Sequence, residues 1–173
     1  GTLGQLEHGV NYADAYLRTI GEAKKETAAL KKWPYRKKSP VTLFVLAGHR
    51  NMEGERAFVQ ELAALEGKAA LLEQNPKIAF RYSLGGGYKK SDTWEPLRPA
   101  GYYDTFGPEL SFGQTLQTGL AGNIAIAKFT HSGTQIIDWT PEGSEAKTRN
   151  IYPDFIAFVQ ESVQQLGEKG HEV

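Results

Sequence analysis

The sequence predicts a single α/β domain built on a parallel sheet. From residue 40 onwards, strand-like and helix-like patterns alternate along the chain, which is typical of parallel strands joined by right-handed helical crossovers. The run Val41–Ala47 is nearly continuous in apolar residues, as expected of a strand covered on both faces. A length of 173 residues suits one medium-sized domain.

The composition argues against several classes of function. The 20 basic and 20 acidic side chains balance, so we expect no nucleic-acid partner. The apolar runs are too short to span a bilayer, so we expect no membrane contact. The absence of cysteine removes disulfides and thiolate chemistry. The chain begins at Gly1 without an apolar leader; we expect a soluble protein and leave open an exported one whose leader has been removed.

The first 39 residues read as a helix followed by a basic linker. Apolar residues recur at helical spacing over residues 12–30, and Trp33-Pro34 ends that pattern. Residues 31–38 then carry five basic side chains. A solvated linker is favoured over a phosphate-binding or membrane-binding segment, because so short a run binds phosphate weakly. We therefore divide the chain into residues 1–39 and residues 40–173.

The second segment predicts a strand, a corner and a helix. We expect Val41–Ala47 to be the central strand of the sheet and Gly48 to form the corner after it. The following helix is indicated by apolar residues at helical spacing, and Gly67 ends it. These apolar residues are Ala57, Phe58, Leu62 and Leu65.

The third segment is less regular. Ile78–Tyr82 reads as a short strand, and the glycine triplet 85–87 follows it. A phosphate-binding loop is rejected here, because no helical pattern and no Lys-Ser/Thr pair follow the glycines. The loop beyond carries Trp94, Tyr102 and Tyr103, which either pin the loop to the body of the domain or stack on sugar rings.

The last segment predicts a helix, a strand and a second helix. Pro108 suits a helix start, and the pattern ends near Gly119. Asn123–Phe129 is a buried third strand by composition. The final helix begins near Pro153 and ends at Gly167. Its expected buried face consists of Phe155, Ile156, Val159, Val163 and Leu166.

Polar clusters follow the first and third strands, at the positions where open α/β sheets bind ligands. If these strands are neighbours, the two clusters surround one cleft together with the helix start near Glu109. Gly107 precedes that helix. The first cluster is Gly48, His49, Arg50 and Asn51, and the second is Thr130, His131, Ser132, Gly133 and Thr134.

Three sequence blocks resemble those of the sialate O-acetylesterase domain family, which includes carbohydrate acetylesterases and belongs to the SGNH-hydrolase group. Phe44–Gly54 resembles the family's Gly-Gln-Ser-Asn-Met block, residues 106–113 its second block, and residues 130–139 its third. The resemblance covers roughly residues 40–173. It implies a flavodoxin-like, three-layer SGNH sandwich with a parallel sheet that is incomplete at its C-terminus, and an acetylated carbohydrate or a small anion as ligand.

The departures from this family decide the functional prediction. Arg50 stands where the family has its serine nucleophile, and a guanidinium cannot accept an acyl group at neutral pH. The family's Asp-x-x-His base motif is not found in these residues. We therefore predict impaired or absent ester hydrolysis, with a non-catalytic glycan- or anion-binding module as the alternative. The enzyme class stays undecided.

Arg50 and Ser132 could have other roles at this cleft. Arg50 either contacts an anionic ligand or forms an internal ion pair, with Glu109 as the favoured partner and Glu53 as the second choice. Ser132 is disfavoured as a substitute nucleophile, because adjacent residues on an extended segment point to opposite sides, away from His131. No spacing suggests a metal site, and we expect no cofactor. His171 reads as a surface residue.

An incomplete sheet has a consequence for association. The third strand would present an open edge or a poorly covered face where the next strand belongs. We expect either self-association or a longer parent chain that completes the sheet.

Overall fold

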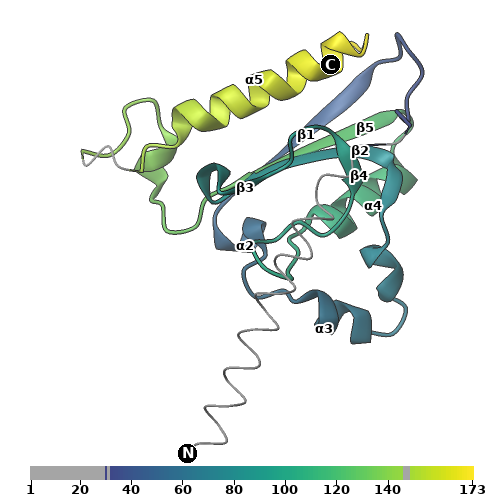
Figure 1. Ribbon diagram of the computed structural model, residues 1–173, viewed down its shortest axis with the longest axis horizontal. Helices are drawn as coiled ribbons and strands as arrows, with labels where there is room; N and C mark the ends of the chain where they lie inside the picture. Colours follow the sequence, from purple (N-terminus) through teal and green to yellow (C-terminus); the bar gives the residue numbers. More distant parts are fainter. Residues whose placement is uncertain (1–29, 31, 146–148) are drawn as a thin grey trace, which may run out of the picture.

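A computed structural model describes residues 30, 32–145 and 149–173 and has three layers. Figure 1 shows helix α5 (Tyr152–Glu168) across one face of the sheet, with α2 (Arg50–Glu53) and α4 (Glu109–Gly119) on the other. The predicted α/β sandwich is therefore confirmed. The predicted helix over residues 12–30 lies outside the described residues, apart from Leu30.

The sheet is mostly parallel. Its order is β1-β5-β2-β3, and β4 also pairs with β2. The three long strands β1, β5 and β2 run parallel, while the short β3 and β4 are antiparallel to β2. The bounds are β1 Val41–Gly48, β2 Asn75–Leu84, β3 Lys89–Lys90, β4 Glu95–Leu97 and β5 Asn123–Thr130.

The prediction that Val41–Ala47 is the central strand is wrong. β5 lies between β1 and β2, and seven of its eight residues are buried. Ala125 and Ala127 leave room for α5 and the aromatic side chains that cover β5, whereas Val45 of β1 is partly exposed. Two apolar runs of equal length look alike in sequence, and only the pairing separates the centre from the edge.

The prediction of an open edge at the third strand is also wrong. In the described part of the chain, the long strand with one paired side is β1, not the third strand β5. The end of the chain reaches the start of this edge, where the N–H of Val41 donates to the carbonyl oxygen of Glu172 at 2.8 Å. The N–H of Lys38 likewise donates to Gly170 at 3.0 Å.

The predicted helices that fall on described residues form, with shorter bounds in the second segment. α4 and α5 match the prediction, whereas only Val59–Ala64 of the second segment forms helix α3. The buried residues of α5 are Phe158, Ser162 and Leu166, which follow one another at a spacing of four residues. Val163, predicted to be buried, is exposed, because the helix is rotated toward Phe158 and Leu166.

Aromatic side chains of the loop after β3 and of the linker before β1 pack together on the α5 face of the sheet. Trp94 is buried and packs in one cluster with Tyr35, Leu166 and Trp33. The indole N–H of Trp33 donates to Nε2 of His171 at 2.6 Å. His171, predicted to be a surface residue, is therefore buried beneath the linker.

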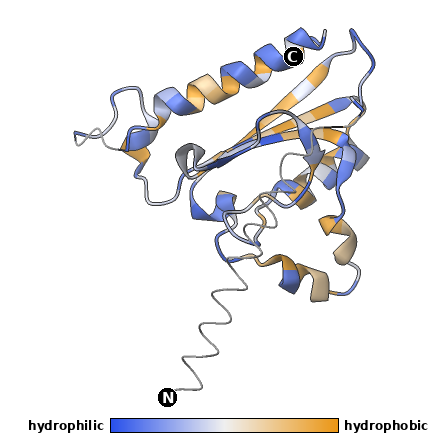
Figure 2. Cartoon of the chain, viewed as in Figure 1, coloured by the Kyte–Doolittle hydropathy of each residue, from blue (hydrophilic) through white to orange (hydrophobic). Residues whose placement is uncertain are grey.

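Apolar residues concentrate along the strands, and Figure 2 shows hydrophilic residues on much of α5. On the α4 face the core contains Leu46, Ile78, Phe80, Tyr82 and Ile126. On the α5 face it contains Ala127, Phe129, Ile151 and Phe158. Among the helices of the described residues, none has the length and apolar character required to cross a bilayer.

Candidate functional site

The corner after β1 places His49 and Arg50 at the carboxyl end of the sheet. α2 begins directly at Arg50, and Gly54 ends it with a φ of 89°. A side chain at Gly54 would lie 1.9 Å from the carbonyl oxygen of Phe106. The tight turn therefore requires glycine, and it brings α2 against the segment that leads into α4.

Arg50 points into solvent and pairs with Glu55, not with Glu109 or Glu53. Its Nε lies 3.2 Å from Oε2 of Glu55, and the two side chains are 60% and 41% exposed. The predicted Arg50–Glu109 ion pair is therefore wrong, since Glu109 has another partner. An exposed pair of this kind contributes about 0–1 kcal/mol, so removing Arg50 should change stability little.

Glu109 forms a buried ion pair with Lys128 of β5. Lys128 Nζ lies 2.7 Å from Glu109 Oε2 and donates to the carbonyl oxygen of Ala100 at 2.6 Å. The other carboxylate oxygen accepts the N–H groups of Ala100 and Gly107, each at 3.0 Å. Both side chains are 0% exposed. Burial lowers the pKa of Lys128, and the Glu109 carboxylate opposes that shift.

This ion pair also contacts α2, because Lys128 Nζ donates to the carbonyl oxygen of Glu53 at 3.4 Å. Glu53 of α2 is buried, and its carboxylate accepts the hydroxyl of Thr130 at 3.0 Å. A side chain on Gly107 would lie 2.3 Å from the carbonyl oxygen of Met52. The structure thus places Gly107 and Glu109 inside the protein, beneath the corner that carries Arg50.

His49 connects the two predicted clusters. The backbone N–H of Gly133 donates to His49 Nε2 at 2.7 Å, which requires that nitrogen to be unprotonated. The N–H of His131 donates to the carbonyl oxygen of Gly48 at 3.2 Å. The loops after β1 and β5 therefore meet, as the sequence predicts for neighbouring strands. Asn51 lies on the exposed side of this corner.

His131 and Ser132 do not form a nucleophile and base pair. His131 Nδ1 lies 2.8 Å from the carbonyl oxygen of Ser132, not from its hydroxyl. Within the residues that the structure describes, the buried Oγ of Ser132 has no hydrogen-bond partner. The hydroxyl of Thr134 donates to the carbonyl oxygen of His131 at 2.8 Å, and Trp139 donates to that hydroxyl at 3.0 Å.

Asp138 shapes the loop that carries Gly133. Its carboxylate accepts the N–H of Gln135 at 2.7 Å. This backbone hydrogen bond, followed by one from Ser144, lowers the pKa of Asp138. Arg149 donates from Nη1 to the carbonyl oxygen of Gly133 at 2.5 Å. In the described ranges, no group of three histidine or carboxylate side chains is arranged to hold a metal.

Three tyrosines gather beside the glycine triplet that follows β2. Tyr88 stacks on Tyr102 with ring centroids 5.2 Å apart, and Tyr103 meets Tyr102 edge-on at 5.3 Å. Tyr88 and Tyr103 are 79% and 59% exposed. A side chain at Gly86, in the same triplet, would lie 2.7 Å from the His131 ring. This tyrosine cluster therefore adjoins the site, while Trp94 pins its loop as described above.

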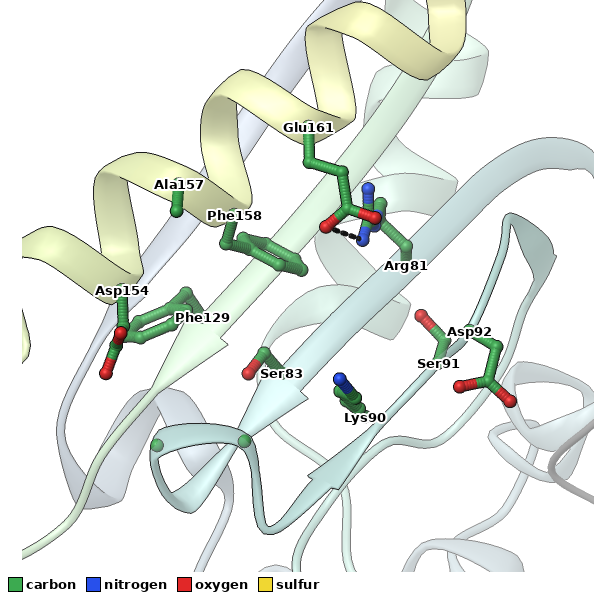
Figure 3. A pocket seen from close by; sticks show the side chains of 12 residues that line it. Arg81, Ser83, Lys90, Ser91, Asp92, Phe129, Asp154, Ala157, Phe158 and Glu161 are labelled. Atoms are coloured by element: carbon green, nitrogen blue, oxygen red, sulfur yellow. Dashed lines mark hydrogen bonds and ion pairs between the residues drawn. The ribbon is translucent and has the colours of Figure 1, made fainter.

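Two cavities lie at this end of the molecule. An open one of about 400 Å³ is lined by Arg50, Asn51, Gly54, Glu55, Arg56 and Ala57. Another of about 330 Å³ lies on the opposite face of the sheet, between α5 and strands β2 and β3, and is drawn in Figure 3. The first is the cavity that the predicted corner residues enter.

The sequence did not lead us to the buried charges Lys128 and Arg81, and Glu53 was considered only as a partner of Arg50. The sequence could have indicated Lys128, because it is a charged residue within the apolar strand Asn123–Phe129. A buried charge of this kind requires a partner. Arg81 stands in the same way inside Ile78–Tyr82. Glu53 had no such signal, because a glutamate in a short helix is normally exposed.

The comparison with models of protein families agrees with the sequence blocks. Residues 40–170 match the family described as carbohydrate esterase, sialic acid-specific acetylesterase. A protein of Arabidopsis thaliana with a known X-ray structure is 20% identical, with a TM-score of 0.49; the match covers 73% of this chain and 52% of that chain. This chain thus spans about half the length of that protein. None of the curated proteins compared with the chain matches it. Because the family match covers most of the sequence, the chain belongs to the sialic acid-specific acetylesterase family of carbohydrate esterases.

Proposed function

We propose that this chain is a carbohydrate esterase-like domain in which Arg50 occupies the position of the family's serine nucleophile. On this proposal the chain hydrolyses esters weakly or not at all. The observation that carries it is the side chain at the corner after β1, an exposed guanidinium paired with Glu55 at 3.2 Å. A guanidinium stays protonated and offers only donors, so it cannot form an acyl intermediate.

The neighbouring side chains support this assignment. His49 Nε2 is already occupied by the N–H of Gly133, and His131 Nδ1 by the carbonyl oxygen of Ser132. Ser132 Oγ is closed off from solvent. None of these three groups therefore combines an accessible nucleophile with a base beside it, which acyl transfer requires.

Ester turnover by the unmodified chain and by Arg50→Ser tests the proposal. We expect no turnover of 4-nitrophenyl acetate or of an O-acetylated sialic acid above the buffer rate by the unmodified chain. Loss of a nucleophile costs about four or more powers of ten in rate. Arg56→Ser is the matched control, because Arg56 is exposed and lines the same cavity.

The outcomes separate the two readings of the site. Turnover that appears in Arg50→Ser and not in Arg56→Ser supports residue 50 as the former nucleophile position. No turnover before or after the change supports a non-catalytic binding module. Hydrolysis by the unmodified chain, unaffected by Arg50→Ala, contradicts the proposal.

A specific observation favours the binding module as the second candidate. The open cavity beside Arg50 and Arg56 offers two guanidinium groups against one carboxylate, Glu55. The tyrosine cluster offers exposed aromatic rings at the same end of the sheet. Cations that hold a carboxylate and rings that stack on a pyranose suit an acetylated carbohydrate or a small anion. The partners proposed for the chain are therefore ligands of this kind, and the edge of β1 that pairs with no strand of the described residues additionally suits pairing with another strand.

A further inference from the structure

The second cavity lies on the face of the sheet opposite Arg50. Figure 3 shows it between α5 and the β2–β3 hairpin, with Phe129 and Phe158 on one side and Ser83 and Lys90 on the other. Its volume of about 330 Å³ is at the lower end of the range of small-molecule sites.

Arg81 is the deepest charge of this cavity. Its side chain is 3% exposed, and Nη2 lies 3.0 Å from Oε2 of Glu161, whose side chain is 54% exposed. The guanidinium carbon lies 4.8 Å from the Phe158 ring centroid and 5.9 Å from that of Trp94. In the described part of the chain, Arg81 Nε and Nη1 have no hydrogen-bond partner.

Unpartnered buried N–H groups are uncommon and costly, so they require an explanation. Aromatic faces compensate the charge of a guanidinium but leave its in-plane donors unused. Glu161 binds from the exposed surface of α5, and its other oxygen accepts Gln165 Nε2 at 3.0 Å. The carboxylate of a ligand therefore finds unused donors on Arg81. To reach them it displaces only the exposed side chain of Glu161.

The other charged side chains of the lining indicate which groups a ligand bound at Arg81 carries besides its carboxylate. Lys90 is a further cation of the lining, whereas Asp92 and Asp154 are exposed carboxylates at the rim. A carboxylate accepts hydrogen bonds from hydroxyl or ammonium groups and repels a second anionic group. The cavity is thus positive at depth, at Arg81, whereas its exposed part carries two carboxylates and the one cation of Lys90.

We propose that this cavity binds a small carboxylic acid that carries hydroxyl or amino groups at its other end. The ligand carboxylate replaces Glu161 on Arg81, and its hydroxyl or amino groups face either Asp154 or Asp92, which Figure 3 shows on opposite sides of the cavity. In the free protein, Glu161 occupies the carboxylate position. This site is independent of the function proposed for the Arg50 corner, because it lies on the other face of the sheet and needs no ester chemistry.

Titration followed by NMR tests the site. The probe is D-gluconate, and D-glucitol is the comparison because it has the same carbon chain without a carboxylate. The signal is the Arg81 Nε–H resonance, assigned by its loss in Arg81→Lys. We expect gluconate to shift this resonance saturably and glucitol to leave it unchanged.

Glu161→Gln supplies the decisive comparison. Removing the competing internal carboxylate should tighten gluconate binding by up to roughly fivefold. Glu168→Gln is the matched control: Glu168 lies on the same helix and accepts Gln164 Nε2 at 2.9 Å, as Glu161 accepts Gln165. Glu168→Gln should change the affinity for gluconate by no more than roughly twofold, because salt screens the effect of one distant charge.

Three results would overturn this site. They are an Arg81 resonance that gluconate does not move, an equal response to glucitol, and gluconate binding in Glu161→Gln that is no tighter than in Glu168→Gln. Because Glu161 is exposed, its variant is expected to fold, so a negative result is informative.

Discussion

Lys128→Met is expected to destabilise the fold by about 3–5 kcal/mol, because it leaves the buried Glu109 carboxylate without its cation. Lys128 lies 2.7 Å from that carboxylate, and both side chains are fully buried. The two backbone donors from Ala100 and Gly107 remain, but they do not neutralise the charge. Urea unfolding followed by circular dichroism measures the change in the free energy of unfolding.

A second variant separates the ion pair from simple packing. In Lys128→Met with Glu109→Gln, residue 109 no longer carries a charge that needs a cation, so a substantial part of the lost stability should return. If the double variant were as unstable as the sum of the two single variants, the pair would have no coupling and the explanation would fail.

Gly54→Ala is expected to cost about 3 kcal/mol or more, the combined cost of a left-handed residue and an overpacked contact. The φ of Gly54 is +89°, and an added Cβ would lie 1.9 Å from the carbonyl oxygen of Phe106. Relief of that contact requires α2 to move away from the segment before α4. The midpoint of thermal unfolding should fall accordingly.

Gly87→Ala is the matched control for backbone strain alone. Gly87 has a φ of +95°, and apart from Gly87 and its two chain neighbours no atom of the described residues lies within 4 Å of the position that an added Cβ would take. Its cost should stay near the roughly 1–2 kcal/mol of a left-handed residue. Equal losses in the two variants would mean that the contact with Phe106 does not fix the corner.

The architecture could be predicted from sequence because strand and helix periods alternate. The bounds of α4, α5, β1 and β5 follow from apolar spacing and from Pro and Gly at helix ends, whereas β2, predicted as Ile78–Tyr82, extends over Asn75–Leu84. The order of the strands could not be predicted, since Val41–Ala47 and Asn123–Phe129 have the same apolar character. Pairing depends on contacts far apart in sequence, which local patterns do not contain.

The site was predicted in outline and not in detail. The proximity of the clusters at His49 and Gly133 followed from the rule that ligands bind beyond the carboxyl ends of neighbouring strands. The partner of Arg50 did not follow, because Glu109 and Glu55 are both carboxylates near the corner. Burial decides between them: Glu109 pairs with the buried Lys128, and Arg50 remains at the surface with Glu55.

The most direct test of the proposed loss of the nucleophile is intact-mass analysis after incubation with a fluorophosphonate, which modifies activated serines. The proposal predicts that the mass of the chain without substitutions stays unchanged after prolonged incubation with excess reagent. A stoichiometric adduct on Ser132, or on any residue of the corner formed by residues 48–55, would contradict it.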